Sequence, residues 1–296
     1  MFSYLWIPAT VVASVFQVAR NGLQRGLMPA TGPWGATLVR FLFGLPFALL
    51  FAGLAWMLTP GADLRFESGF WVSAIVGAAG QVVATASLLV AMRRAGFAVA
   101  TAVQQSSLPL AAFIGLLVYH DRLGALAWAG VAVTTAGLGV LTWPRQAAGM
   151  RPASGAAFSL VSGLCFGFTL NAFRHATLAL DAAHPIFAAL VCVAVVQAMQ
   201  SAALTAWLAV RDPAALRAVA AGWRQSVGAG FCGACASAGW FTALALAAAA
   251  PVRAVGVIEA PIAAFAGRRF FSERLQLRQV AAGAAVLAGV VMTTLG

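Results

Sequence analysis

One carboxylate, Glu259, lies well inside a long apolar stretch of the chain that runs from Pro251 to Leu275. Its position about seven residues into the predicted membrane span 252–271 corresponds to a depth of roughly 10 Å, too deep for a glutamate side chain to reach water. An acid at the centre of a membrane helix costs about 2.5 to 3.5 kcal/mol, so water, a basic partner or protonation must offset it. Glu259 therefore has the chemistry of a group that exchanges a proton for a substrate ammonium. The alternative is a protonated acid bonded permanently to a neighbouring helix.

Further polar side chains lie within other apolar stretches, and we predict that they form a substrate site together with this carboxylate. The predicted site consists of Glu259, Trp240, Arg40, Gln81, Gln104, Gln105 and Ser107. Counting residues along the predicted helices places Glu259 toward one membrane face and Arg40 toward the other. A zwitterion such as an amino acid would then put its ammonium on Glu259 and its carboxylate on Arg40. The alternatives are that Arg40 snorkels or bonds helix carbonyls, and that the amides and hydroxyls join helices without touching substrate.

Two polar stripes with helical spacing occur near the ends of predicted helices. Gln17, Arg20 and Asn21 lie near the end of the first predicted helix, and Asn171 and Arg174 near the end of the sixth. We predict that these stripes are gates on opposite faces of the membrane. The alternative is that an arginine in a last helical turn simply suits the helix dipole.

The sequence contains no recognisable catalytic motif and no complete set of metal ligands. Cys232 and Cys235 have the spacing of half a zinc site, but a closed zinc site needs about four ligands and no histidine lies in the same apolar run. The sequence contains no nucleophile elbow, no phosphate-binding loop and no usefully spaced pair of carboxylates. We therefore expect no metal, no cofactor and no enzymatic activity.

The composition places these residues in a membrane protein. Of 296 residues, 62% are apolar and 8% are charged, whereas about 25% of the residues of a soluble domain are charged. The net charge of +11 comes from single and paired arginines scattered between apolar runs. This pattern indicates membrane orientation and provides no basic stripe for nucleic acid, so we expect the lipid bilayer as a partner and no nucleic acid.

Ten apolar runs are long enough to form helices that cross a ~30 Å hydrocarbon core, because roughly 20 residues suffice. The runs are continuous and not alternating, which favours helices over barrel strands. The predicted fold is all-α, with spans near residues 4–22, 33–58, 70–92, 96–118, 124–143, 153–176, 185–209, 226–249, 252–271 and 275–295. In the longest connection, Asp212 and Pro213 predict the start of a short helix that lies on the membrane, with an ordinary loop as the alternative.

The chain contains an internal repeat. After a shift of 152 residues, segment 109–123 matches segment 261–275 with seven identities in fifteen positions and no gap, and Pro109 falls on Pro261. We predict two five-helix halves, residues 1–146 and 147–296. Because five spans is an odd number, the second half enters the membrane from the opposite side, and such inverted repeats place a site near mid-membrane between the halves. The two prolines are expected to kink equivalent helices.

Four short segments carry a resemblance to a known family: Val39 to Phe41, Ala91 to Gly96, His120 to Leu123 and Ser272 to Leu275. On these segments the chain resembles the EamA-type branch of the drug/metabolite transporter superfamily, over essentially its whole length. The resemblance implies ten helices in two repeats and a secondary carrier that exports small organic solutes, such as amino acids or related metabolites. It also implies a multi-pass protein of the bacterial plasma membrane.

Two other functions compete with this expectation. If Glu259 and Trp240 alone form the substrate site, the favoured function is proton-coupled efflux of lipophilic cations or drugs. A membrane-embedded enzyme or a channel is the weaker alternative. No nucleotide-binding segment is present, so the energy would come from the solute gradient or from protons as the coupling ion. We expect a monomer or a homodimer.

Arginines outside the predicted spans are unevenly placed. Twelve of the sixteen fall on the membrane face opposite the N-terminus, and the other four are Arg65, Arg122, Arg174 and Arg253. Because short loops follow the positive-inside rule, this distribution predicts that both termini face outward.

Overall fold

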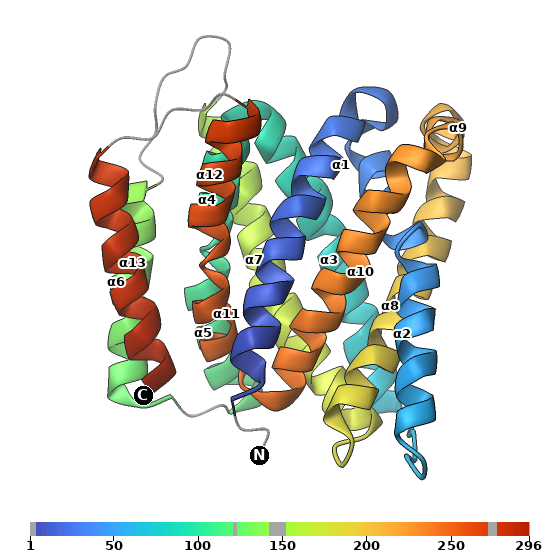
Figure 1. The fold of residues 1–296 in the computed structure, drawn as a ribbon, viewed down its shortest axis with the longest axis horizontal. Coiled ribbons are helices and arrows are strands. Elements are labelled where there is room, and N and C mark those ends of the chain that lie inside the picture. The colour runs from blue at the N-terminus through green and yellow to red at the C-terminus, as the bar shows by residue number, and fades with distance from the viewer. Residues whose placement is uncertain (1–3, 121–122, 142–151, 272–276, 296) are drawn as a thin grey trace. The chain divides into compact units, whose positions relative to one another are not determined.

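The computed structural model describes residues 4–120, 123–141, 152–271 and 277–295, and within these ranges the regular structure is helical, without strands (Figure 1). The helices in chain order are α1 (Trp6–Leu42), α2 (Leu45–Leu58), α3 (Ser68–Ala95), α4 (Phe97–Gln104), α5 (Ser107–Tyr119), α6 (Ala125–Leu141), α7 (Pro152–Leu180), α8 (Pro185–Arg211), α9 (Pro213–Ala221), α10 (Trp223–Leu246), α11 (Ala249–Gly256), α12 (Glu259–Phe271) and α13 (Leu277–Leu295). The all-α prediction is therefore confirmed for this part of the chain.

Several of these helices have the length and apolar composition of membrane spans. Within the described residues, five helical segments qualify: Trp6–Leu58, Ser68–Ala95, Ala153–Leu180, Pro185–Arg211 and Trp223–Leu246. Together with the apolar composition of the chain, they make this a membrane protein. The full set of ten spans stays a prediction.

The first segment turns back on itself at Gly32. The backbone there has φ 64° and ψ 174°, which glycine adopts readily because it has no Cβ. Pro33 follows, and its fixed φ and missing N–H suit the start of a new helix. The helix before the turn extends well past the predicted end at residue 22. Its polar residues between positions 17 and 24 face the buried interior and do not end the helix.

Two helices are broken at positions that differ by the repeat offset. The bounds of α4 and α5 (97, 104, 107 and 119) fall, after a shift of 152, on those of α11 and α12 (249, 256, 259 and 271). Both breaks contain the same tightened turn, in which Ser106 N donates to Val103 O at 3.1 Å and Ile258 N donates to Val255 O at 3.2 Å. A proline ring excludes the carbonyl four residues before it, so Pro109 and Pro261 each disrupt the helix one turn upstream. The expected kinks are thus found as breaks.

The chain divides into two compact units. Unit 1 comprises Met1–Val82 and Ala172–Ala247, and unit 2 comprises Val83–Asn171 and Ala248–Gly296. Each unit therefore contains segments from both predicted halves of the chain. The predicted boundary between the halves, at residues 146 and 147, lies outside the described residues, as do Asp121, Arg122 and the segment 272–276.

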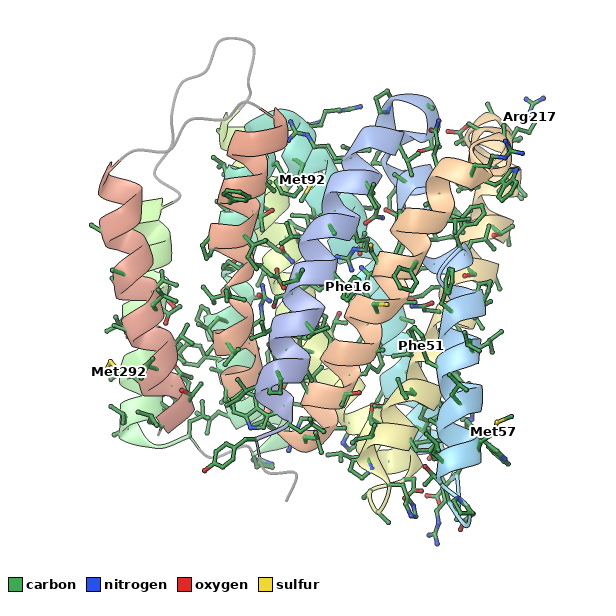
Figure 2. The ribbon with its side chains drawn as sticks, viewed as in Figure 1. Phe16, Phe51, Met57, Met92, Arg217 and Met292 are labelled. Carbon is green, nitrogen blue, oxygen red and sulfur yellow. The ribbon has the colours of Figure 1, made fainter. Side chains whose placement is uncertain are left out.

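In unit 1, α10 packs closely on α1 through glycines. A side chain at Gly239 would approach the carbonyl oxygen of Ala9 to 2.8 Å, and one at Gly230 would overlap the backbone of Phe43, between α1 and α2. In the same interface Phe16, labelled in Figure 2, packs edge-on against Phe231 at 6.0 Å between ring centroids.

The predicted short helix after Asp212 is present as α9. The Asp212 carboxylate accepts a hydrogen bond from Ala215 N at 3.0 Å, and Pro213 is the first helical residue. Val219 is buried on the apolar core of unit 1, whereas Arg217 projects away from it (Figure 2). The N-cap and proline signals were therefore sufficient to locate this helix.

In unit 2, the broken helices lie side by side and run in opposite directions. Helix α4 packs on α12, and α5 packs on α11, so that α4 and α12 share one end of the unit and α5 and α11 the other (Figure 1).

Two glycines of α7, Gly163 and Gly167, approach the break between α4 and α5. A side chain at Gly163 would lie 3.0 Å from the Gln104 carbonyl oxygen, and one at Gly167 would lie 3.1 Å from that of Ser107. Glycine at positions 163 and 167 therefore allows α7 to pack closely against the break between α4 and α5.

The contact between Gly230 and Phe43 predicts a specific sensitivity to substitution. Gly230→Ala should lower the free energy of unfolding by about 1 to 3 kcal/mol, because its methyl group would overlap the backbone. The matched control is Gly53→Ala in α2, where nothing lies within 4 Å and alanine is the better helix former by about 0.5 to 1 kcal/mol. Thermal unfolding of the two purified variants in detergent measures the difference. Equal unfolding temperatures would contradict the packing of α10 on the break between α1 and α2.

Candidate functional site

Glu259 forms a buried ion pair with an arginine in unit 2. Its Oε1 accepts a hydrogen bond from Arg253 Nη1 at 3.1 Å, and the two side chains are 0% and 3% exposed. Its Oε2 accepts from Gln105 Nε2 at 3.4 Å. Arg253 also donates from Nε to Ser107 Oγ at 2.7 Å and from Nη2 to Gln105 Oε1. We call these four residues the Arg253–Glu259 cluster.

The two helix breaks bring this cluster together. Arg253 belongs to α11 and Glu259 is the first residue of α12, so the break between them separates the partners. Gln105 lies in the break between α4 and α5, and Ser107 is the first residue of α5. In a continuous helix, residues six positions apart point to different faces. The break therefore lets Arg253 and Glu259 meet.

Arg253 is the residue that sequence reasoning missed. We counted it among the loop arginines on the side of the N-terminus. In the structure it is 2% exposed and forms the ion pair with Glu259. Its removal from the loop set leaves twelve arginines against three, which strengthens the asymmetry behind the orientation prediction. The available signal was its place at the second residue of the predicted span 252–271.

Two further arginines are buried in unit 1. Arg20 is 0% and Arg40 is 1% exposed, so the side chain of Arg40 lies among protein atoms and does not snorkel. Both flank Gly233 of α10: the position of its missing Cβ lies 3.1 Å from Arg40 Cγ and 3.4 Å from Arg20 Cδ. Together with Asn21 and Ser237 they form what we call the Arg20–Arg40 cluster.

Neutral groups bond to both of these guanidinium groups. Arg20 donates from Nε and Nη2 to Asn21 Oδ1 at 3.2 and 2.7 Å. Arg40 Nη2 lies 3.5 Å from Ser237 Oγ, and its guanidinium stands 4.9 Å from the centroid of the Phe41 ring. The glycine at position 233 gives both arginine stems room beside α10.

Other residues of the predicted site join helices within unit 1. Trp240 Nε1 donates to Gln17 Oε1 at 2.9 Å and so links α10 to α1. Gln200 Nε2 donates to Gln81 Oε1 at 2.9 Å and to Ala78 O at 3.1 Å, linking α8 to α3. These contacts agree with the alternative interpretation of the buried amides, in which they join helices and do not touch the substrate.

The structure distributes the predicted gate residues between the units. Gln17, Arg20 and Asn21 are buried partway along α1 of unit 1, not at its end. Asn171, in unit 2, donates to the carbonyls of Ala111 and Gly167, both at 3.1 Å. Arg174, in unit 1, donates from Nε to the carbonyl of Ala247 at 3.2 Å.

The residues of the predicted substrate site come from both units. Glu259, Gln105 and Ser107 meet in unit 2, where Gln104 is also buried. Arg40 meets Arg20 and Asn21 in unit 1, whose segments also contain Trp240 and Gln81. Among the described residues, no group of three or more histidine, cysteine or acidic side chains is arranged to hold a metal.

Comparison with known proteins supplies a fold likeness. No family model and no curated protein matches the sequence. Among solved structures 29 chains match. One of them, described as "Crystal structure of protein", superposes with a TM-score of 0.64 at 18% identity over 97% of this chain and 96% of the other. At that identity the likeness shows the fold alone.

The Arg253–Glu259 ion pair predicts how substitutions combine. An isolated carboxyl group would tolerate Glu259→Gln, but here the change leaves Arg253 as a buried charge whose carboxylate is gone, which should cost about 3 to 5 kcal/mol of unfolding free energy. The double variant Arg253→Gln with Glu259→Gln removes both charges and should recover most of that loss. Thermal unfolding of the single and double variants tests this coupling.

The control for the ion pair is Glu67→Gln, which removes an exposed acid of unit 1 and should change stability by no more than about 0.5 kcal/mol. If Glu259→Gln is as stable as the unsubstituted protein, or if the double variant is less stable than both single variants, the pair is not the stabilising contact described here.

Proposed function

We propose that the protein is a secondary transporter that exports small organic solutes, such as amino acids or related metabolites, across the bacterial plasma membrane. We further propose that it is an EamA-type member of the drug/metabolite transporter superfamily, with ten spans in two inverted five-helix repeats. The observation that carries the proposal is the pair of broken helices in unit 2, related by the repeat offset and holding buried polar groups at their breaks.

The packing of unit 2 supports an inverted arrangement. The repeat pairs α4 with α11 and α5 with α12, and the structure packs α4 on α12 and α5 on α11. If α4 is exchanged with α11, and α5 with α12, the contact of α4 with α12 becomes the contact of α11 with α5. The set of contacts is therefore unchanged, as expected for antiparallel repeats related by a two-fold axis. Helices α6 (Ala125–Leu141) and α13 (Leu277–Leu295) begin at the same offset and also pack on each other.

Broken helices with polar groups at the break are what carriers built from inverted repeats use near mid-membrane. The break frees backbone carbonyls and exposes a helix N-terminus, and both can hold a substrate or an ion inside the membrane. In unit 2 the two breaks supply Gln105, Ser107 and Glu259. A polar centre of this kind is costly in lipid and is retained where it serves transport.

The competing proposal, efflux of lipophilic cations, required Glu259 and Trp240 to form a site by themselves. The indole of Trp240 donates to Gln17 in unit 1, and Glu259 is paired with Arg253 in unit 2. Each group therefore already has a hydrogen-bonding partner within its own unit, which favours the first proposal over this one.

Counterflow in proteoliposomes tests the proposal. Vesicles with purified protein are loaded with an excess of unlabelled leucine, succinate or tetraphenylphosphonium and diluted into the matching radiolabelled solute. A carrier gives a transient accumulation above equilibrium for at least one solute, and a channel gives equilibration only. Simple equilibration, or no uptake beyond protein-free vesicles for every solute, would contradict a carrier.

Two serines of unit 2 provide a matched pair of variants for this assay. Ser107→Ala removes the hydroxyl that accepts from Arg253 and should slow counterflow about tenfold, since a hydrogen bond to a charged group contributes about 1.5 to 3 kcal/mol. Ser159→Ala removes a buried hydroxyl that donates to the Gly155 carbonyl of its own helix and should leave the rate unchanged. Equal rates for both variants would place the Arg253–Glu259 cluster outside the transport path.

A further inference from the structure

We infer that unit 1 binds the headgroup of an anionic phospholipid at the end of the unit where α9 lies. The binding residues are Arg211, Arg217 and Arg224 together with Trp207 and Trp223, and we call this set the α9 surface. Two observations carry the inference: the position of the three arginines at the ends of membrane spans, and the exposed apolar side chains beside them. It concerns the lipid around the protein and does not depend on what the protein transports.

The arginines of the α9 surface lie where two membrane spans end. One candidate span ends at Arg211, and the next begins at Trp223 with Arg224 as its second residue. Between these spans lies α9, which contains Arg217 and packs on α1 and α8, as Figure 1 shows. The three arginines therefore share one end of unit 1, at the level where a span leaves the hydrocarbon and meets the headgroups.

The segment that carries these arginines has an excess of positive charge. Between Trp207 and Arg224 the sequence has three arginines and one acid, Asp212. The three arginine side chains are exposed. Asp212 is engaged as the N-cap of α9, because its carboxylate accepts from Ala215 N at 3.0 Å. The segment therefore presents positive charge to the headgroup region.

The other acids of unit 1 lie at the opposite end of the spans. Asp63 and Glu67 occur in the connection between α2 and α3, and Asp181 occurs in the connection between α7 and α8. These two connections meet, because Arg65 N donates to the last carbonyl of α7 at 2.9 Å. The 27 residues of α8 separate that end from the α9 surface by about 40 Å. These acids are therefore too far away to neutralise the α9 surface.

Exposed apolar side chains lie beside the arginines on the hydrocarbon side. On α8, Trp207 and Val210 are 41% and 82% exposed, and Trp207 precedes Arg211 by one helical turn on the same face. On α10, Trp223 is exposed and the Arg224 guanidinium stands 5.5 Å from the centroid of its ring. Tryptophan is enriched where hydrocarbon meets headgroups. A ligand along this surface meets apolar side chains first and guanidinium groups next, which matches the two parts of a phospholipid.

Helix α9 has an outer face of small residues around one arginine. Val219 is buried against unit 1, whereas Ala214, Arg217 and Ala221 are exposed at helical spacing. Arg217 Nε donates to Pro213 O at 3.4 Å, which uses one of the five guanidinium donors. The alanines on either side leave this guanidinium accessible to a headgroup phosphate, which can accept a bidentate pair from arginine.

The spans hold this surface among lipid headgroups, which favours a lipid over a dissolved anion as the ligand. Basic side chains on an interfacial helix are attracted to anionic lipids, and the attraction acts only within about a Debye length of the headgroups. The cytoplasmic leaflet carries the negative surface potential. The α9 surface lies on the face that the arginine distribution predicts to be cytoplasmic, so both arguments point to the same leaflet.

Two phospholipids that differ only in their headgroups test the inference. Phosphatidylglycerol is anionic, and phosphatidylcholine with the same acyl chains is neutral overall. The purified protein in a non-ionic detergent is titrated with each lipid, and native mass spectrometry measures the bound lipid. We expect phosphatidylglycerol to bind at least about tenfold more tightly, with a preference that decreases as salt screens the arginines. Equal binding of the two lipids overturns the inference.

Variants locate the bound lipid. Arg211→Gln, Arg217→Gln and Arg224→Gln should each weaken phosphatidylglycerol binding about fivefold, the factor that corresponds to one arginine near an anionic surface. The triple variant should bind both lipids equally. The control is Arg65→Gln, which removes an exposed arginine at the opposite end of unit 1, 3.6 Å from Asp63, and should keep the full preference. A triple variant that keeps the preference, or an Arg65→Gln variant that loses it equally, overturns the inference.

A soluble headgroup separates a lipid site from a site for a dissolved anion. Glycerol phosphate carries the phosphate without acyl chains, so it lacks the contacts with the exposed apolar side chains. We expect phosphatidylglycerol to raise the unfolding temperature of the unsubstituted protein and of Arg65→Gln but not of the triple variant. Glycerol phosphate at the same concentration should have no effect. If it raises the unfolding temperature as much as the lipid, and through the same three arginines, the ligand is a dissolved anion and the lipid inference is wrong.

Discussion

The structure depends on one constraint: a charge buried in an apolar protein must be balanced where it lies. Only 8% of the residues are charged, yet unit 2 places Arg253 and Glu259 in its interior and satisfies both oxygens of the carboxylate. The desolvation of two ions is offset only when their geometry is good and their remaining hydrogen-bonding capacity is used. Gln105 serves both partners, donating to Glu259 and accepting from Arg253. The pair is therefore balanced locally.

The helix breaks follow from this requirement and from two prolines. A straight helix would hold Arg253 and Glu259 on different faces, and the break one turn before Pro261 removes that restriction. The equivalent break before Pro109 brings Gln105 and Ser107 to the pair. The glycines of α7 allow close approach at that point, because Gly163 and Gly167 leave the backbone around residues 104 to 107 accessible. The prolines break the helices, the glycines allow close packing at the break between α4 and α5, and together they permit the Arg253–Glu259 ion pair to form.

Much of the fold was predictable because apolar runs, prolines and caps are local signals. The helix breaks could be placed from Pro109 and Pro261, and α9 from Asp212 and Pro213. Glu259, Gln105 and Ser107 are three of the seven residues of the predicted substrate site, and Arg253 links these three in the structure. The extent of α1 was underestimated because polar residues between 17 and 24 lower the hydropathy of a helix that is buried on that face.

The part that could not be predicted was the pairing of charges. Hydropathy treats an arginine near the end of a run as a loop residue, and Arg253 was assigned to a loop for that reason. Whether an arginine faces water or a carboxylate is decided by tertiary contacts, and single-sequence reasoning has no access to them. Arg40 lies beside Arg20 in unit 1, and its predicted link to Glu259 through a shared substrate stays a prediction.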